Sequence, residues 1–222
     1  MAGFPERHHD HTSVRRLSRL LAVGAMLLIA DGVDHPVEAA ELSPGISQLY
    51  TSVSINPPTA KSMTVCYGFV CRRRESLDFT SADRAALRRI LAAGRSSAAA
   101  ETPGCPEGGG WFDRRMGSIL GTDKRVARAD FRAGDDKHNF DCWDTTRNVT
   151  SLLLILQEWG RLKFHTVGNP RYRGNTLVLQ TPHNTAVLVE RATRVEWTVD
   201  MWKRGFAQLP DVMTVDQWIK QD

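Results

Sequence analysis

Residues 138–160 read HNFDCWDTTRNVTSLLLILQEWG, so that one of the most apolar runs of the chain follows a cysteine. The large apolar side chains of this run recur at helical spacing, which predicts a helix with one face against a core. They are Val149, Leu152, Leu153, Leu156 and Trp159. Asn139 and Asp141 are residue types that cap helix N-termini, and Gly160 suits the left-handed position that ends many helices. The segment therefore predicts a helix that begins near Cys142.

A cysteine in the first turn of a helix lies beside unpaired backbone N–H groups and the positive end of the helix dipole. Both favour the thiolate over the thiol, so we expect Cys142 to be reactive. A free cysteine is more often a buried packing residue. The argument for Cys142 as a nucleophile therefore depends on residues further along the chain.

The composition is that of a globular protein. The chain has 222 residues, of which 41% are hydrophobic and 24% charged, which excludes wholesale disorder and allows one domain with a sizeable core. The formal net charge is +4, and the basic residues are scattered without aromatic residues between them on one element. A nucleic-acid partner is therefore not expected.

The N-terminus has the pattern of an export signal. An arginine-containing stretch that ends at Arg19 precedes an uncharged run at residues 20–30, and small residues surround a predicted cleavage site between Ala39 and Ala40. The run is too short to span a bilayer but is typical of a signal peptide. We predict a signal peptide at residues 1–39, a periplasmic or secreted protein, and no stable membrane anchor after cleavage. An N-terminal amphipathic helix that stays attached is the alternative.

Residues 40–222 are predicted to form a single domain with its core at about residues 130–202. Residues 95–110 are rich in Ser, Ala, Pro and Gly, which predicts a mobile surface loop inside the domain. After residue 160 the apolar period changes from 3.6 to 2, which predicts strands. They are expected at residues 162–167, 176–180, 185–190 and 195–200. Helices followed by an antiparallel sheet indicate the α+β class.

Four cysteines are present: Cys66, Cys71, Cys105 and Cys142. An extended chain of five residues spans about 16 Å, whereas a disulfide requires Cα atoms within about 7 Å. Cys66 and Cys71 can therefore form a disulfide only if the chain turns between them, and both the bridged and the free state remain open. An exported protein permits such a bridge.

A histidine and an aspartate stand at the outer ends of two neighbouring predicted strands. If Glu190 pairs with Val195 across the tight connection, Thr185 faces Asp200 in the same antiparallel register. His183 shares a face with Thr185, so Asp200 is its diagonal neighbour at about 7–8 Å between Cα atoms. A slip of one residue would put the two side chains on opposite faces.

These residues suit nucleophilic catalysis. Cys142 would be the nucleophile, His183 the general base and later the acid for the leaving amine, and Asp200 the group that orients the imidazole. The backbone N–H of Cys142 would form half of an oxyanion hole. Asn139 and Trp111 are candidates for the second donor.

Less specific interpretations stand beside this one. A histidine that opens a strand is usually a surface residue, and an aspartate can simply end a strand. His138 and Cys142, four residues apart, could bind zinc together with His165 or His183. No CxxC or HExxH spacing supports a zinc site, so the sequence predicts neither a metal site nor a cofactor.

The run Asp-Cys-Trp-Asp at residues 141–144, His183 opening a strand and Asp200 ending the next resemble the transglutaminase-like cysteine peptidases of bacteria. These are exported papain-like proteins with a Cys-His-Asp triad, and the resemblance covers about a third of the chain, residues 130–202. It implies a transglutaminase-like, papain-like fold in which the N-terminal helix of the catalytic core packs on an antiparallel sheet. Many members carry an acidic residue after the nucleophile, where this chain has Trp143, and some use calcium nearby.

The sequence thus predicts an exported thiol amidohydrolase. It would cleave a peptide or isopeptide amide through an acyl-enzyme on Cys142, or transfer the acyl group, and its partner would be a peptide or protein substrate. Two alternatives stay open: a non-catalytic periplasmic binding or scaffold domain of the same fold, and a murein-cleaving cysteine peptidase. The identity of the substrate and the oligomeric state are not predicted.

Overall fold

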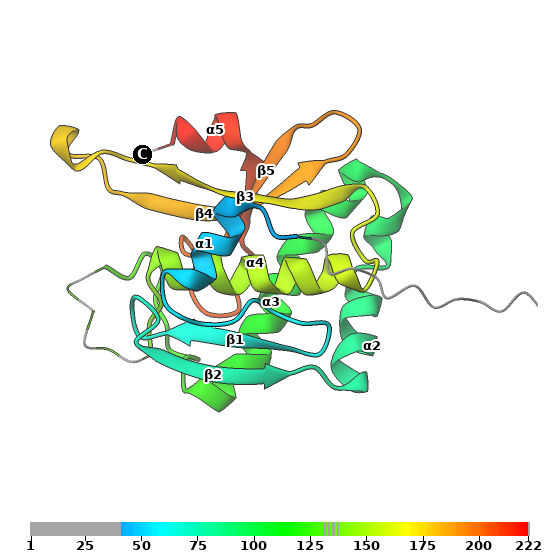
Figure 1. Cartoon of the computed structure of the whole chain (residues 1–222), viewed down its shortest axis with the longest axis horizontal. Helices are drawn as coiled ribbons and strands as arrows, with labels where there is room; N and C mark the ends of the chain where they lie inside the picture. The colour runs from blue at the N-terminus through cyan, green and yellow to red at the C-terminus, as the bar shows by residue number, and fades with distance from the viewer. Residues whose placement is uncertain (1–40, 131, 133, 135, 137, 222) are drawn as a thin grey trace, which may run out of the picture. The chain divides into compact units, whose positions relative to one another are not determined.

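Helix α4 (Cys142–Glu158) runs between two β structures, a four-stranded sheet on one side and a two-stranded hairpin on the other (Figure 1). This is a computed structural model that describes residues 41–221 except 131, 133, 135 and 137, and the side chains of 103, 105, 106 and 178 are also outside the description. The predicted signal peptide at residues 1–39 lies outside the described residues. Glu41–Asp222 form one compact unit.

The elements follow one another in an order that separates the hairpin from the sheet. They are α1 (Pro44–Thr51), β1 (Ser62–Tyr67), β2 (Arg73–Asp78), α2 (Ser81–Ile90), η1 (Ala93–Ser96), α3 (Ala98–Leu120), α4, β3 (His165–Arg173), η3 (Thr176–Val178), β4 (His183–Glu190), β5 (Glu196–Asp200), β6 (Asp211–Thr214) and α5 (Val215–Ile219). Strands β1 and β2 pair antiparallel, and β3-β4-β5-β6 form the second, wholly antiparallel sheet. The predicted α+β class is confirmed.

Helix α4 has the boundaries that its capping residues predict. The side chain of Asp141 accepts a hydrogen bond from the backbone N–H of Asp144 (2.7 Å), and Gly160 follows the helix with a φ of 64°. A left-handed glycine lets the chain turn back, and the N–H of Arg161 reaches the carbonyl oxygen of Leu156 (2.8 Å). Cys142 is therefore the first residue of the helix.

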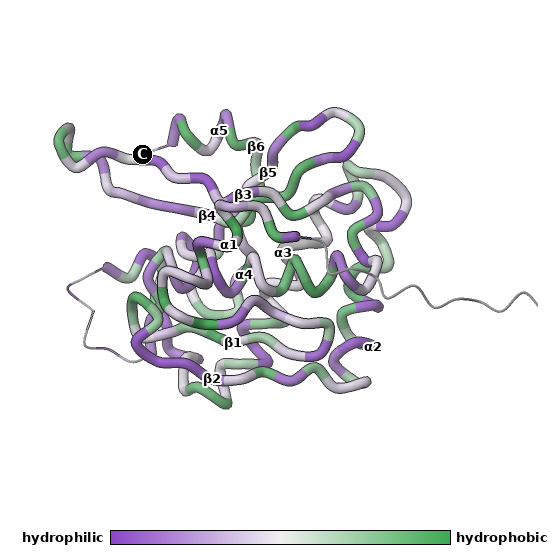
Figure 2. The backbone as a smooth tube through the Cα atoms, in the orientation of Figure 1, coloured by the Kyte–Doolittle hydropathy of each residue, from purple (hydrophilic) through white to green (hydrophobic). Residues whose placement is uncertain are grey.

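The apolar residues of α4 form the centre of the main core. This core lies where α4, β1, β4 and α3 meet, and it includes Leu153, Leu156, Val65, Leu188 and Phe112. The surface-facing strand β2 is polar, as its purple colour shows in Figure 2. The predicted apolar face is thus correct, but α4 also buries most of its polar residues, because α1 and β1 cover that side as well.

Residues 95–110, predicted as a mobile surface loop, instead form the second half of η1 and the first half of α3. The low helix propensity of the glycines is overridden by packing. A Cβ atom at Gly109 would lie 2.7 Å from Pro210 Cγ, and one at Gly117 would lie 2.4 Å from Phe206 Cε2. The glycines therefore let neighbouring segments approach the helix closely, which composition does not reveal.

The segment at residues 176–180 is also not the predicted strand. Gly174 and Leu179 both have left-handed backbones, with φ of 84° and 59°, and the side chain of Asn175 accepts a hydrogen bond from the N–H of Leu177 (2.9 Å). These turns produce η3 at the tip of the β3–β4 hairpin. The first strand of the sheet, β3, begins instead at His165.

Among the described residues between 41 and 221, no helix is both long enough and apolar enough to cross a membrane.

The close packing of α3 leads to a prediction about two adjacent glycines. Replacing Gly109 with Ala puts a methyl group against the rigid ring of Pro210, so we expect ~1–3 kcal/mol of lost unfolding free energy from overpacking. Replacing Gly108 with Ala meets only Leu87 Cδ2 at 4.0 Å. That control should gain up to ~1 kcal/mol from helix propensity. Urea denaturation of both variants measures the difference, and a more stable G109A would contradict the packing.

Candidate active site

The helix start that carries Cys142 is held by two buried carboxylates. Asp141 accepts from the N–H of Asp144 through one oxygen and from the N–H of Val70 through the other, both at 2.7 Å. Asp144 is fully buried and accepts from the N–H of Cys71 (2.7 Å). Both carboxylates therefore tie the first turn of α4 to one short turn after β1.

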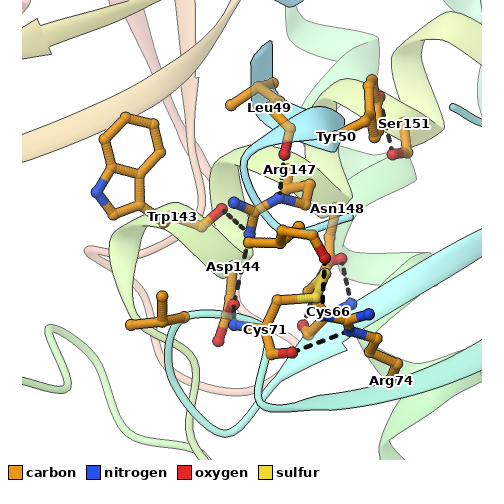
Figure 3. Close-up of a disulfide and its surroundings, with 12 residues drawn as sticks. Leu49, Tyr50, Cys66, Cys71, Arg74, Trp143, Asp144, Arg147, Asn148 and Ser151 are labelled. Carbon is orange, nitrogen blue, oxygen red and sulfur yellow. Dashed lines mark hydrogen bonds and ion pairs between the residues drawn. A yellow bond between two sulfur atoms is a disulfide. The ribbon is translucent and has the colours of Figure 1, made fainter. Parts of the chain in front are cut away.

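That turn, Gly68–Cys71, has four consecutive left-handed residues with φ of 71°, 67°, 51° and 55°. Such a backbone costs roughly 1–2 kcal/mol for each residue other than glycine. The Cys66–Cys71 disulfide, with Cα atoms 4.5 Å apart, closes the turn, and the two carboxylates accept its N–H groups (Figure 3). The bridge that the sequence leaves open is thus formed, because the chain does turn at Gly68.

Polar side chains of α4 fix the helix to β1 and α1. Asn148 accepts from the backbone N–H of Cys66 (2.8 Å) and donates to its carbonyl oxygen (2.7 Å). Arg147 donates to the carbonyl oxygen of Leu49 (2.6 Å) and lies 3.6 Å from Asp144 (Figure 3). Burial and the charge of Asp141 raise the pKa of Asp144 to about 7. A buried polar network of this kind holds one orientation of the helix start.

His183 and Asp200 meet as the hairpin register predicts. Ala186 pairs with Val199 in the antiparallel β4–β5 ladder, which is the register expected from the tight connection. His183 Nε2 and Asp200 Oδ2 lie 2.7 Å apart, and both side chains are buried. The carboxylate therefore orients the imidazole and sets which nitrogen faces away from it.

Two tryptophans enclose this pair. The ring of His183 lies 4.5 Å from that of Trp202 and 5.3 Å from that of Trp218, measured between centroids. Trp218 Nε1 also donates to Asp200 Oδ2 (2.9 Å). Burial alone would raise the pKa of Asp200, but the hydrogen bond and the charge of His183, with the Trp218 N–H, outweigh it and leave the pKa lowered. Asp200 is thus kept ionised beside the imidazole.

Asn184 joins the start of β4 to Cys142. In the orientation that satisfies its neighbours, its side-chain nitrogen donates to the carbonyl oxygen of Cys142 (2.7 Å). Its backbone N–H acts on the thiol sulfur and lowers the pKa of Cys142. Since Asn184 follows His183 directly, the start of β4 lies next to the start of α4.

The expectation of a resting thiolate is wrong. Burial raises the pKa of the Cys142 thiol to about 11, and the negative charges of Asp141 and Asp200 add to this effect. The Asn184 N–H and the thiol's own backbone N–H offset only part of it. A helix N-terminus favours a thiolate, but here the desolvation of the sulfur is the larger effect.

The nitrogen of His183 that faces away from Asp200 is the natural proton acceptor. Its Nδ1 atom is buried and has no hydrogen-bond partner among the described residues, so it makes no hydrogen bond to Cys142 Sγ. Nucleophile–base hydrogen bonds are often loose before substrate binds. The imidazole is therefore oriented by Asp200, with its second nitrogen free to accept a proton.

Neither candidate for the second oxyanion donor is available, because the side chains of both are engaged in other contacts. Asn139 is buried, accepts from the N–H of Val126 (2.8 Å) and donates to Asp136 (2.8 Å), so its amide braces the loop before α4. Trp111 stacks on Phe79 in the main core at 6.3 Å between centroids. The backbone N–H of Cys142 remains a candidate donor.

The histidines of the zinc alternative are engaged elsewhere. His138 pairs with Asp136 and His165 with Glu101, each at 2.9 Å. In the part of the chain that the structure describes, no three His, Cys, Asp or Glu side chains lie together as metal ligands would.

Two cavities flank the site and share Leu179, Gln180, Thr181 and Trp202. The cavity that contains Cys142 has a volume of about 490 Å³ and is lined mainly by apolar side chains, among them Phe69 and Trp143. The cavity that contains His183 has a volume of about 250 Å³ and is lined by basic side chains. The two cavities are therefore adjacent, with Cys142 in the wall of one and His183 in the wall of the other.

Sequence reasoning did not include Trp202 and Trp218 in the site, because no motif or spacing links them to His183 and Asp200. It also missed the turn Gly68–Cys71, for which the pair of cysteines was the one available signal.

Comparison of the chain with protein-family models, with curated proteins and with solved structures finds no match.

The turn at the helix start leads to a prediction about the disulfide. Replacing Cys66 and Cys71 with serine removes the closure of the left-handed turn, so we expect a loss of ~2 kcal/mol in unfolding free energy. The carboxylate of Asp141 should also lose the Val70 N–H. Urea denaturation with and without reductant provides the measurement.

In that experiment the double variant serves as the control, because reductant should destabilise the wild type to a similar degree and leave the variant unchanged. A variant as stable as the oxidised wild type would show that the turn holds without its bridge.

Proposed function

We propose that the chain is an exported thiol amidohydrolase of the transglutaminase-like class that forms an acyl-enzyme on Cys142. The observation that carries the proposal is the 2.7 Å contact of His183 with Asp200, with Nδ1 unbonded, at the strand end next to the cysteine-bearing helix start. A buried imidazole oriented by a carboxylate is the arrangement that general-base activation of a thiol requires.

In the first step His183 Nδ1 takes the proton of Cys142, and the sulfur attacks the carbonyl carbon of an amide. The C–N bond then breaks, and the imidazolium returns the proton to the leaving amine. Water, activated by the same imidazole, releases the acyl group as an acid, or a second amine takes it. Asp200 stabilises the imidazolium throughout, because its own pKa is lowered.

The environment of the thiol suits a nucleophile that ionises only with its partner. A pKa of about 11 keeps the isolated thiol protonated at neutral pH. When a substrate brings Sγ and Nδ1 into contact, the positive imidazolium offsets the buried negative charge of the sulfur. The proposal therefore requires a thiolate–imidazolium pair to form on substrate binding.

Three observations support the remaining parts of the proposal. A cysteine-bearing helix packed on an antiparallel sheet is what the transglutaminase-like fold would contain. The Cys66–Cys71 disulfide favours an oxidising compartment and so supports export. The largely apolar cavity at Cys142 could hold the acyl part of a peptide.

A non-catalytic scaffold is the second candidate, and two observations favour it. The pKa of Cys142 is raised, and its sulfur makes no hydrogen bond to His183. A site that has lost its catalytic activity would have the same two features. The two candidates differ in whether His183 changes the reactivity of the thiol, which can be measured without knowledge of the substrate.

We expect the Cys142→Ala variant to lose amidohydrolase or acyl-transfer activity by at least ~10³-fold, since the nucleophile is absent. Residues 40–222 of the wild type and the variant would be compared on a mixed peptide library and on muropeptides, with cleavage read by mass spectrometry. Cys105→Ala is the matched control, and its activity should equal that of the wild type. Cleavage that persists in Cys142→Ala would exclude the proposed nucleophile.

The pH dependence of alkylation separates the enzyme from the scaffold. In a Cys105→Ala background, we expect a peptidyl chloromethyl ketone, which occupies the cavity as a substrate would, to modify Cys142 at pH 7 at least ~10²-fold faster than in the same protein with His183→Ala. The imidazole lets the thiolate form near neutrality, whereas a thiol of pKa about 11 reacts only as the pH approaches that value. Rates measured by intact mass from pH 5 to 10 that are the same in both proteins would support the scaffold.

A further inference from the structure

The cavity beside His183 has an unusual charge. Among the described residues, the charged side chains that line it are Arg128, Arg173 and Lys203, all of them cationic, with no aspartate or glutamate beside them. The imidazole of His183 and the ring of Trp202 form another part of its wall. Cations held together around a small concave space create a site for an anion.

These cations are held in place by neutral groups. Lys203 Nζ donates to Gln221 Oε1 (2.6 Å), and Arg173 donates to the backbone carbonyl oxygens of Trp218 and Gln221. The backbone N–H of Arg128 donates to the carbonyl oxygen of Trp202 (2.8 Å), which fixes its main chain at the cavity. The amide oxygen of Gln221 positions Lys203 without neutralising its charge.

Two of the three cations have no carboxylate of their own. Within the residues that the structure describes, neither Arg128 nor Lys203 forms an ion pair with Asp or Glu. Burial and the charges of Arg173 and Arg128 lower the pKa of Lys203 and outweigh the opposite effect of the Asp200 and Asp211 charges. The group therefore repels itself in the absence of an anion, and a bound carboxylate would relieve that repulsion.

The direction of acyl transfer determines which fragment of a substrate would occupy this cavity. The acyl fragment becomes bonded to the sulfur of Cys142, so it occupies the larger cavity that Cys142 lines. The amine fragment receives its proton from His183, so it lies on the side of His183. The basic cavity contains His183 and not Cys142, and it is therefore on the leaving-group side.

We propose that the basic cavity is a subsite for a carboxylate on the leaving-amine fragment, with Arg128 and Lys203 as its specificity-determining residues. This inference rests on the proposed function, since it uses the direction of acyl transfer. The carboxylate has two sources with the same chemistry, the side chain of an acidic residue after the cleaved bond or a free C-terminus close to it. A charge-assisted hydrogen bond to either would favour the anionic fragment over its neutral amide.

Binding of leaving-group mimics tests the subsite apart from catalysis. The Cys142→Ala protein, which cannot turn over, would be titrated with glutamyl-alanine amide, its neutral counterpart glutaminyl-alanine amide, and alanyl-alanine as the free acid and as the amide. The shift of the Gly174 backbone N–H signal in NMR spectra reports binding at the basic cavity, because Gly174 lines this cavity and not that of Cys142. We expect a carboxylate to bind about tenfold tighter than its neutral counterpart.

The charge variants decide whether the cavity causes this preference. Arg128→Gln with Lys203→Gln should bring the affinity ratio close to one, while Lys124→Gln, an exposed cation that lines neither cavity, should leave the ratio unchanged. A preference for glutamyl-alanine amide assigns the acidic side chain, and one for free alanyl-alanine assigns the C-terminus.

Equal binding of charged and neutral mimics, or a preference that survives the double variant, would overturn the subsite. These results do not depend on turnover. Failure of the amidohydrolase itself would appear separately, as a Cys142 whose alkylation does not depend on His183.

Discussion

The burial of α4 on nearly every side is the constraint on which the rest of the structure depends. A helix enclosed in this way must satisfy its polar groups internally, because unpaired buried polar atoms cost about 1–3 kcal/mol each. Asp141 and Asp144 Oδ1 do so by accepting N–H groups from the turn Gly68–Cys71, and Asn148 by pairing with the backbone of Cys66. The position of Cys142 is thus set from outside its own helix.

The pair of His183 and Asp200 is positioned by strand pairing and not by the polar contacts that hold the start of α4. His183 and Asp200 come from adjacent strands, and their contact follows from the hairpin register, but the rings of Trp202 and Trp218 exclude water from it. Excluding water strengthens the hydrogen bond between imidazole and carboxylate. Burial also raises the pKa of the Cys142 thiol, so packing at the site both strengthens the contact that orients the base and suppresses ionisation of the nucleophile.

Sequence reasoning was most successful where local rules determine geometry. The period of the apolar residues and the cap at Asp141 located α4, and a tight connection with period-2 strands placed His183 opposite Asp200. It failed at residues 95–110, where contacts such as Gly109 with Pro210 outweigh poor helix propensity. It also assigned Trp111 to the site, although this side chain packs in the core against Phe79.

The sequence by itself determined the α+β class, the start of α4 and the side of the sheet shared by His183 and Asp200, because these depend on periodicity, capping and strand alternation. Only the tertiary structure decided the disulfide-closed turn, the tryptophan enclosure, the protonated state of Cys142 and the basic cavity beside His183. The physical reason is that desolvation and the field of neighbouring charges depend on which distant segments meet, and no local pattern encodes that meeting.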